Sequence, residues 1–340
     1  MQAIQDDSLF YTSSVIAPGM RHLFDNYEPA IEKAAREITN RGIREVIGVG
    51  GGASLSCMMG IEHLLTRFST LPAKAVNGTE LLSRTPRLDR SAVVLTSYSG
   101  QTPEVVAVAE EARRQGAYVI GITEHEGTPL AKLSDTPIGI QSKAVFISPL
   151  TVGYLLSAYL LKARGESAAE ADVLLRDLHA FPEAVPALIE KASALAKGMV
   201  GPLAEHYYVI AGGPQQGLGY KLALSVIIEN LWTNGAFINT GEFYHGPIEI
   251  VQKDGPSFLC LLGEDPSRAA AERVVRFLER QGAPLVTFDS RTYGSYSPEM
   301  APFPLFIATE LWVMWTAATL GHDVDERRYM GRLSRTWGEF

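Results

Sequence analysis

The chain has 340 residues, 46% of them hydrophobic and 20% charged, which is the composition of a folded protein rather than a largely disordered one. Its net charge of −8 disfavours a protein that binds nucleic acid through bulk positive charge. The two cysteines, Cys57 and Cys260, are too few for a disulfide framework or a Cys/His zinc site, so we expect no structural metal. A chain of this length favours about two domains.

The N-terminal residues contain neither the basic segment nor the apolar segment of a signal peptide, so we expect a cytoplasmic protein. Two apolar stretches, residues 144–161 and 302–320, approach the length of a membrane span. The first contains Ser, Thr, Pro and Gly, and Glu310 interrupts the second. We therefore expect buried helices and no membrane association.

Short apolar runs alternate with helical patterns, as is typical of a parallel α/β sheet. In the first half we expect strands at residues 44–49, 73–76, 92–96, 118–122 and 136–140, with helices at 55–68 and 103–115. Helical sequence at 151–200 joins the halves, with a break at 165–167 and a helix bounded by Pro182 and Pro186. In the second half we expect strands at 207–211, 257–262 and 284–288, and helices at 222–232 and 269–281.

The two halves resemble each other. Arg114-Gln115-Gly116-Ala117 recurs 166 residues later as Arg280-Gln281-Gly282-Ala283, and the strands recur in the same order at nearly the same offset. An internal duplication explains both observations. We predict two doubly wound α/β subdomains, each with a central parallel sheet, at residues 30–165 and 195–325, followed by a C-terminal tail at 326–340.

A cluster of hydroxyl groups lies between the third strand and the next helix. Ser97, Ser99 and Thr102 fall within six residues, and Gly100 allows the backbone to approach a ligand closely. A helix N-terminus at the carboxyl end of a strand suits a phosphate monoester. The alternative is an ordinary helix cap, with Thr102 as the capping residue and Pro103 at the first helical position.

The glycine-rich loop at residues 50–54 also joins a strand to a helix. It does not have the GxGxxG spacing, and no acidic residue follows at the position that binds a ribose, so a dinucleotide site is disfavoured. Alone, the loop fits a tight turn equally well. Together with residues 97–102 it indicates one shared pocket at the sheet edge.

Glu229 and His245 are candidates for proton transfer. Glu229 lies in an apolar helical run, where burial raises a carboxyl pKa toward neutrality, unless the side chain faces solvent. His245 lies in a loop between Gly241 and Pro247, near two carboxylates. A structural histidine bonded to one of these carboxylates is the alternative.

Several segments resemble the sugar isomerase (SIS) domain family. They are the glycine-rich strand end with Ser54, the S-x-S-G-x-T loop at 97–102, and Gly241-Glu242-Phe243-Tyr244-His245-Gly246-Pro247. Two such domains in tandem are similar to the isomerase half of glucosamine-6-phosphate synthase. The G-E-F-x-H-G-P-x-E-I segment, the chain length and residues 325–329 are most similar to the fructosamine-6-phosphate deglycases of the fructoselysine-6-phosphate type. The resemblance covers the chain from about residue 30.

The resemblance assigns roles to particular residues. It implies that the sugar phosphate is bound by Gly52, Ser54, Ser97, Ser99, Gln101 and Thr102. It also implies that Glu229 is the catalytic carboxylate and that His245 opens the sugar ring. Further candidates are Glu242, Arg327 and Arg328. Val226 stands where the synthase pattern has a lysine, which disfavours amino-sugar synthesis and favours the deglycase branch.

The expected reaction cleaves a fructosamine 6-phosphate of an amino acid to glucose 6-phosphate and a free amine, without a metal, nicotinamide or pyridoxal cofactor. An aldose–ketose amino-sugar isomerase or glucosamine-6-phosphate deaminase would use the same two residues. A non-catalytic sugar-phosphate sensor is a further alternative. Tandem relatives are dimers, which implies a homodimer with shared active sites, His245 of one chain reaching Glu229 and the phosphate loop of the other.

Overall fold

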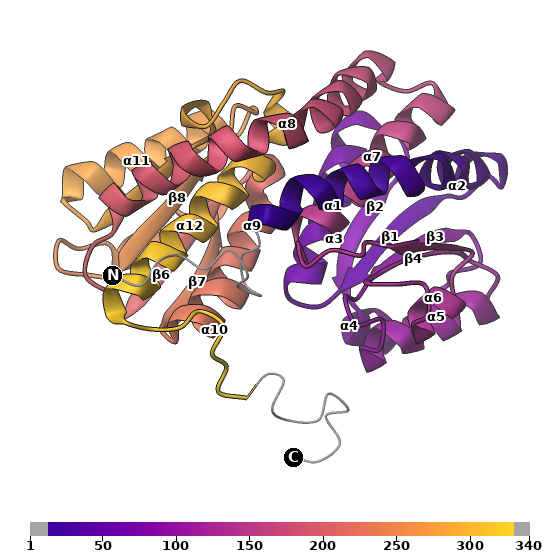
Figure 1. Ribbon diagram of the computed structural model, residues 1–340, viewed down its shortest axis with the longest axis horizontal. Coiled ribbons are helices and arrows are strands. Elements are labelled where there is room, and N and C mark those ends of the chain that lie inside the picture. The colour runs from indigo at the N-terminus through magenta and orange to yellow at the C-terminus, as the bar shows by residue number, and fades with distance from the viewer. Residues whose placement is uncertain (1–12, 330–340) are drawn as a thin grey trace. The chain divides into compact units, whose positions relative to one another are not determined.

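The computed structural model describes residues 13–329, which form two compact units, residues 15–182 and 183–328 (Figure 1). Each unit is built on one parallel sheet, of five strands in the first and four in the second. The predicted fold class, α/β with two doubly wound parallel sheets, is confirmed. We call the two the N-terminal unit and the C-terminal unit.

The sheet of the N-terminal unit has the order β2-β1-β3-β4-β5. Its strands are β1 (Glu45–Gly50), β2 (Ala73–Asn77), β3 (Ser91–Thr96), β4 (Tyr118–Thr123) and β5 (Thr136–Gly139). β1 pairs with β2 on one side and with β3 on the other. The strand order therefore reverses at β1, and the crevice between the carboxyl ends of β1 and β3 is the switch point where ligands of such sheets bind.

Helices cover both faces of this sheet (Figure 1). They are α1 (Ser13–Asn26), α2 (Glu28–Asn40), α3 (Ala53–Phe68), α4 (Gly78–Ser83), α5 (Pro103–Arg114), α6 (Pro129–Lys132) and α7 (Ile147–Arg164). Residues of α4, α5 and α6 form one core with β1, β3 and β4, while α3 and α7 pack together on the other side with α2. α7 is buried nearly all round, which explains the apolar stretch at 144–161.

The sheet of the C-terminal unit has the order β7-β6-β8-β9, which repeats the order of the first four strands of the other sheet. Its strands are β6 (His206–Ala211), β7 (Asn234–Asn239), β8 (Ser257–Leu262) and β9 (Leu285–Asp289). The helices are α9 (Gln216–Lys221), the π-helical segment η2 (Leu222–Ile227), α10 (Ile228–Leu231), α11 (Arg268–Gln281) and α12 (Pro302–Leu320). Short 3-10 turns are η1 (Gly213–Gln215), η3 (Thr240–Glu242), η4 (Pro247–Ile250), η5 (Ser290–Thr292) and η6 (Pro298–Met300).

One linker prediction is wrong. α8 (Ala168–Met199) is a single helix that continues through Pro182 and Pro186, so these prolines do not bound a helix. Each proline removes one helical hydrogen bond. Phe181, Val185 and Leu188 are nonetheless buried along the same helix, and this packing outweighs the local preference to break. The predicted break before α8 is present, with Gly165 in the left-handed conformation after α7.

α12 is the one helix in residues 13–329 that is long and apolar enough to cross a membrane by length and composition. The apolar stretch Pro298–Leu320 includes η6, and 78% of its 18-residue apolar window is buried inside the protein. The core helix of a soluble protein passes the same test. Glu310 lies in the middle of α12 and is fully buried, and it pairs with a lysine of the same unit.

Candidate active site

The hydroxyl cluster lies at the carboxyl end of β3, at the switch point of the N-terminal sheet. Ser97 Oγ and Thr102 Oγ1 are 2.7 Å apart and hydrogen-bonded, and Ser99 Oγ accepts a hydrogen bond from the Gln101 amide at 3.3 Å. Thr102 occupies the N-cap position of α5, with Pro103 at the first helical position, but its side chain makes no capping bond. The hydroxyl of Thr102 therefore points to Ser97 and leaves the first N–H groups of α5 without a side-chain cap.

Gly100 fixes the shape of this loop. Its φ angle is +60°, and a Cβ atom there would come within 2.4 Å of the Thr128 side chain. The Gly100 carbonyl also accepts a hydrogen bond from the Leu130 amide at 3.1 Å. The loop is thus closed against the start of α6, and glycine is the residue that both the backbone angle and the available space require.

The glycine-rich loop after β1 lies beside the hydroxyl cluster, because β1 and β3 are neighbouring strands. Gly52 is the N-cap residue of α3, and Ser54 lies half-buried in the first turn. Two side chains that the sequence pattern does not indicate also reach this edge, those of Asn77 and Glu104. A Cβ atom on Gly51 would lie 3.9 Å from both Asn77 Nδ2 and Glu104 Oε1. The expected convergence of the two loops is therefore present within the N-terminal unit.

The corresponding loop of the C-terminal unit has a different chemistry. Asp265 follows β8 at the offset of 166 residues from Ser99 and is buried. Its carboxylate accepts a hydrogen bond from the Ser267 amide at 2.9 Å and one from Gln215 Nε2 at 3.3 Å. Gly213, with φ +61°, leaves room for this carboxylate. A carboxylate of the protein thus occupies the place where the N-terminal unit presents hydroxyl groups. No group of three or more His, Cys, Asp or Glu side chains within residues 13–329 could hold a metal ion.

Glu229 lies on α10 of the C-terminal unit, and its side chain is 28% exposed. Burial raises the pKa of this carboxyl above its ordinary value, while the positive charges of Arg327 and Lys221 lower it. Arg327 Nε lies 3.8 Å from Glu229 Oε2. Burial is the larger effect, so the pKa of Glu229 lies above its ordinary value.

A buried ion pair that sequence analysis missed lies in the same unit. Lys221 Nζ is 2.7 Å from Glu310 Oε1 of α12, and the two side chains are 6% and 0% exposed. The one available signal was Glu310 itself, the single charge in an apolar stretch. Between Lys221 and Glu229 the helix is π-helical, a form often found at functional sites, and Val226 there is buried.

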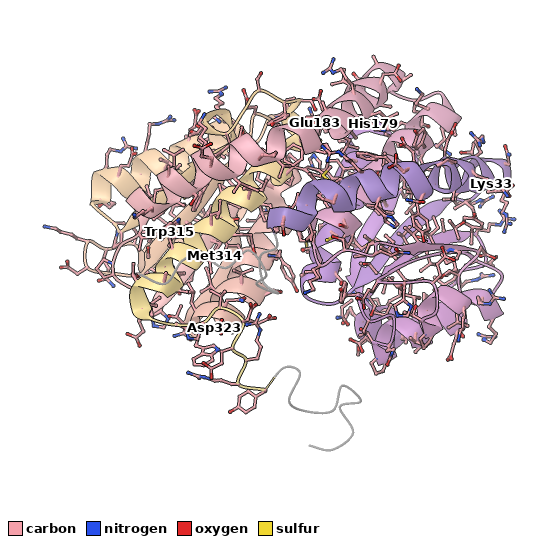
Figure 2. All side chains as sticks on the ribbon, viewed as in Figure 1. Lys33, His179, Glu183, Met314, Trp315 and Asp323 are labelled. Atoms are coloured by element: carbon pink, nitrogen blue, oxygen red, sulfur yellow. The ribbon has the colours of Figure 1, made fainter. Side chains whose placement is uncertain are left out.

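The segment after α12 packs against α10. Asp323 lies in this segment, three residues after α12 ends at Leu320 (Figure 2). Asn230 Nδ2 donates a hydrogen bond to the Val324 carbonyl at 2.7 Å, and the Arg328 guanidinium lies 4.5 Å from the centre of the Trp232 ring. The structure therefore brings two candidates, Arg327 and Arg328, to the helix that carries Glu229. The rest of the predicted tail, residues 330–340, lies outside the described residues.

His245 lies in the loop between η3 and η4, after β7. Phe243 is buried and anchors this loop, while Glu242, Tyr244 and His245 are exposed. The His245 amide donates a hydrogen bond to the Glu242 carbonyl at 2.9 Å. Glu229 precedes the amino end of β7 and His245 follows its carboxyl end, and six residues of strand separate the two ends by roughly 15–20 Å. One C-terminal unit therefore does not bring Glu229 and His245 together.

Comparison with known proteins agrees with this architecture. Residues 41–163 match the model of the SIS domain. The chain is 32% identical over 311 residues to fructoselysine 6-phosphate deglycase of Escherichia coli (strain K12), covering 90% of this chain and 91% of the relative. The chain belongs to this family of SIS-domain deglycases. It is also 26% identical to fructosamine deglycase of Bacillus subtilis (strain 168), covering 89% and 96% of the two chains.

A more distant relative shares the fold. Glucosamine-6-phosphate deaminase from Thermotoga maritima superimposes with a TM-score of 0.69 at 19% identity, over 95% of this chain and 97% of that one. Its likeness concerns the fold alone. The deglycase relatives alone support an enzyme of the phosphosugar deglycase or isomerase type.

We predict that Lys221→Met lowers the midpoint of thermal unfolding, because it leaves Glu310 buried without its counter-ion, typically a loss of about 3–5 kcal/mol. Burial raises the pKa of Glu310 above its ordinary 4.5, so the carboxyl is neutral at low pH and must ionise as the pH rises. The loss should therefore be smaller at pH 5 than at pH 8, as measured by circular dichroism.

The matched control is the double variant Lys221→Met/Glu310→Leu, which replaces the pair by apolar side chains. Its midpoint should return close to that of the unmodified protein. Equal loss in the single and double variants would show that the ion pair is not what the single substitution disrupts.

Proposed function

We propose that the enzyme cleaves a phosphorylated Amadori compound, the fructosamine 6-phosphate of an amino acid, to glucose 6-phosphate and the free amine. The observation that carries this proposal is the environment of Glu229 on α10. Burial raises the pKa of its carboxyl, and the guanidinium of Arg327 lies beside it. The deglycase relatives, which align over nine-tenths of the chain, support the choice of substrate class.

The phosphate group of this substrate binds, in our proposal, at the switch point of the N-terminal unit. Gly52, Ser54, Ser97, Ser99, Gln101 and Thr102 supply hydroxyl groups and backbone N–H groups there. The uncapped N-terminus of α5 and the hydroxyl pair of Ser97 and Thr102 support this assignment. These groups hold and orient the substrate and take no part in proton transfer.

The chemistry then needs two proton-transferring groups. His245 moves the proton of the ring hydroxyl, so the ring opens and C2 becomes a carbonyl. Glu229 takes a proton from C1, and the electron pair of that C–H bond forms the C1–C2 double bond of an enaminol, while the π electrons of the C2 carbonyl move to its oxygen, which takes up a proton. A proton added at C2 then converts the enaminol to a protonated imine at C1. Water adds to the imine carbon, and the C–N bond breaks to give the aldehyde of glucose 6-phosphate and the free amine. No cofactor supplies an atom or electron to this sequence.

We further propose that the active site is shared by two chains of a homodimer, because His245 and Glu229 lie at opposite ends of β7 in one chain. The exposed loop with Tyr244 and His245 is the element that reaches the partner. The proposed domain boundaries are 30–165 and 195–325, with 326–340 as a tail. A cytoplasmic location is part of the proposal, since a sugar phosphate is charged and does not cross a membrane unaided.

The decisive experiment is a product assay. Incubation with a panel of fructosamine 6-phosphates should release glucose 6-phosphate and amine in equal amounts, whereas Glu229→Gln should fold normally and lose about 10²–10⁴ in kcat. Because burial raises the pKa of Glu229, kcat/KM of the unmodified enzyme should fall on acidification at a pH above 4.5. Release of ammonia from glucosamine 6-phosphate, with none from the panel, would favour a deaminase instead.

Removal of one hydroxyl from the phosphate loop tests the binding role. Ser99→Ala should raise KM for the phosphorylated substrate several-fold and lower kcat much less, because Ser99 holds the phosphate and touches no reacting atom. Ser267→Ala, in the corresponding loop of the C-terminal unit, is the matched control and should leave KM unchanged. Unaltered KM in alanine variants of Ser97, Ser99 and Thr102 would contradict the assignment.

Complementation tests the shared site. Glu229→Gln and His245→Ala proteins should each be inactive, and mixing them under conditions of subunit exchange should restore up to about a quarter of the full activity. A heterodimer then holds one site with both unmodified groups. Sizing chromatography and a tag on one variant would verify exchange. Exchange without any recovered turnover would rule out a site shared between chains.

A further inference from the structure

Arg327 lies beside Glu229, the proposed catalytic carboxylate. The positive charge of its guanidinium has no close ion-pair partner among the described residues. Its Nε lies 3.8 Å from Glu229 Oε2, which is longer than a charge-assisted hydrogen bond. Its Nη1 donates hydrogen bonds to the carbonyls of Val324 and Glu326, which orient the guanidinium without neutralising it. Nη2 has no hydrogen-bond acceptor among the described residues, and the side chain is 21% exposed. Arg327 is thus fixed in position and retains donors for a ligand.

The surroundings keep this guanidinium in place. The chain around it is tied to α10 by the hydrogen bond from Asn230 to the Val324 carbonyl and by the stacking of Arg328 on Trp232. The neighbouring cation of this unit, Lys221, is already paired with Glu310 at 2.7 Å. Among Arg327, Arg328 and Lys221, Arg327 is the cation that lies beside Glu229 and has a hydrogen-bond donor, Nη2, that is free within the described part of the chain.

The chemistry of the proposed reaction determines what lies next to Glu229. Glu229 acts at C1, so the neighbouring part of the substrate is the amine and its substituent. The phosphate is assigned to the loop of the N-terminal unit, and a protonated amine would be repelled by a guanidinium. The group that Arg327 suits is a carboxylate, which matches the planar guanidinium in a two-bond contact.

We propose that Arg327 binds the α-carboxylate of the amino acid in the substrate, so that the enzyme acts on sugar phosphates attached through an α-amine. This inference rests on the proposed function. In an α-linked compound the carboxylate carbon lies about 4 Å from C1, comparable to the separation of Arg327 from Glu229. In a compound linked through the ε-amine of lysine it lies up to about 9 Å from C1.

The test uses three 6-phosphorylated fructosamines, those of alanine, of ethylamine and of lysine linked at its ε-amine. Ethylamine is alanine without the carboxylate. The unmodified enzyme should prefer the alanine compound over both others in kcat/KM. Arg327→Ala should lower kcat/KM for the alanine compound about 10–100-fold, the usual effect of one charged hydrogen-bonded contact, and change the ethylamine compound less than about threefold. Arg280→Ala, which removes an exposed cation of the same unit, is the matched control and should alter neither.

Two results would overturn the inference. An equal loss on the alanine and ethylamine compounds would show that Arg327 acts through Glu229 and not on a carboxylate. Equal turnover of all three compounds by the unmodified enzyme would show that no carboxylate is recognised. Binding to the Glu229→Gln protein, measured by calorimetry, separates the two proposals. If no compound is turned over but the alanine compound still binds more tightly than the ethylamine compound, and loses this advantage in Arg327→Ala, the proposed function fails and the carboxylate site stands.

Discussion

The direction of the strands is the constraint on which the site depends. In a parallel sheet every strand ends at the same edge, so the loops after β1 and β3 meet there, as do those after β6 and β8. A helix that follows a strand runs back from the carboxyl edge of the sheet to its amino edge. The helical segment from α9 to α10 follows β6 in this way, so Glu229, near its end, lies toward the amino end of β7. His245 follows the carboxyl end of β7. This separation within one chain is the reason that proton transfer by both residues requires, in our proposal, a second chain.

The two sheets share a strand order, but the loops at their carboxyl edges differ in chemistry. The loop after β3 presents the hydroxyl groups of Ser97, Ser99 and Thr102, and that after β8 presents Asp265. The buried carboxylate of Asp265 accepts a hydrogen bond from the Ser267 amide near the start of α11. In the N-terminal unit, by contrast, no side chain caps the start of α5. A second negative charge would be repelled there. We therefore propose different tasks for the two units, phosphate binding for the first and acid–base chemistry for the second.

All strands except β7 could be predicted from the sequence, most readily those that are continuous apolar runs because they are buried in a parallel sheet, as β3 and β8 are. β7 escaped prediction because it is an edge strand of sequence NGAFIN, half-exposed and without such a run. Local context and resemblance made Glu229 and His245 candidates, and their roles remain predictions. The Lys221–Glu310 pair and the contact of Arg327 with Glu229 could not, because each joins segments far apart in sequence and only packing brings them together.

The electrostatics of Glu229 connects its pKa to the proposed substrate. Burial raises the pKa of the carboxyl, and the charges of Arg327 and Lys221 limit the rise. Lys221 is paired with Glu310, so its effect on Glu229 stays constant, whereas Arg327 is partly exposed and retains hydrogen-bond donors for a ligand. A substrate carboxylate bound to Arg327 would cancel much of that cation's effect and add a negative charge nearby. The pKa of Glu229 would then rise as the site fills, and the carboxylate would become a stronger base at the moment that a proton of C1 lies beside it.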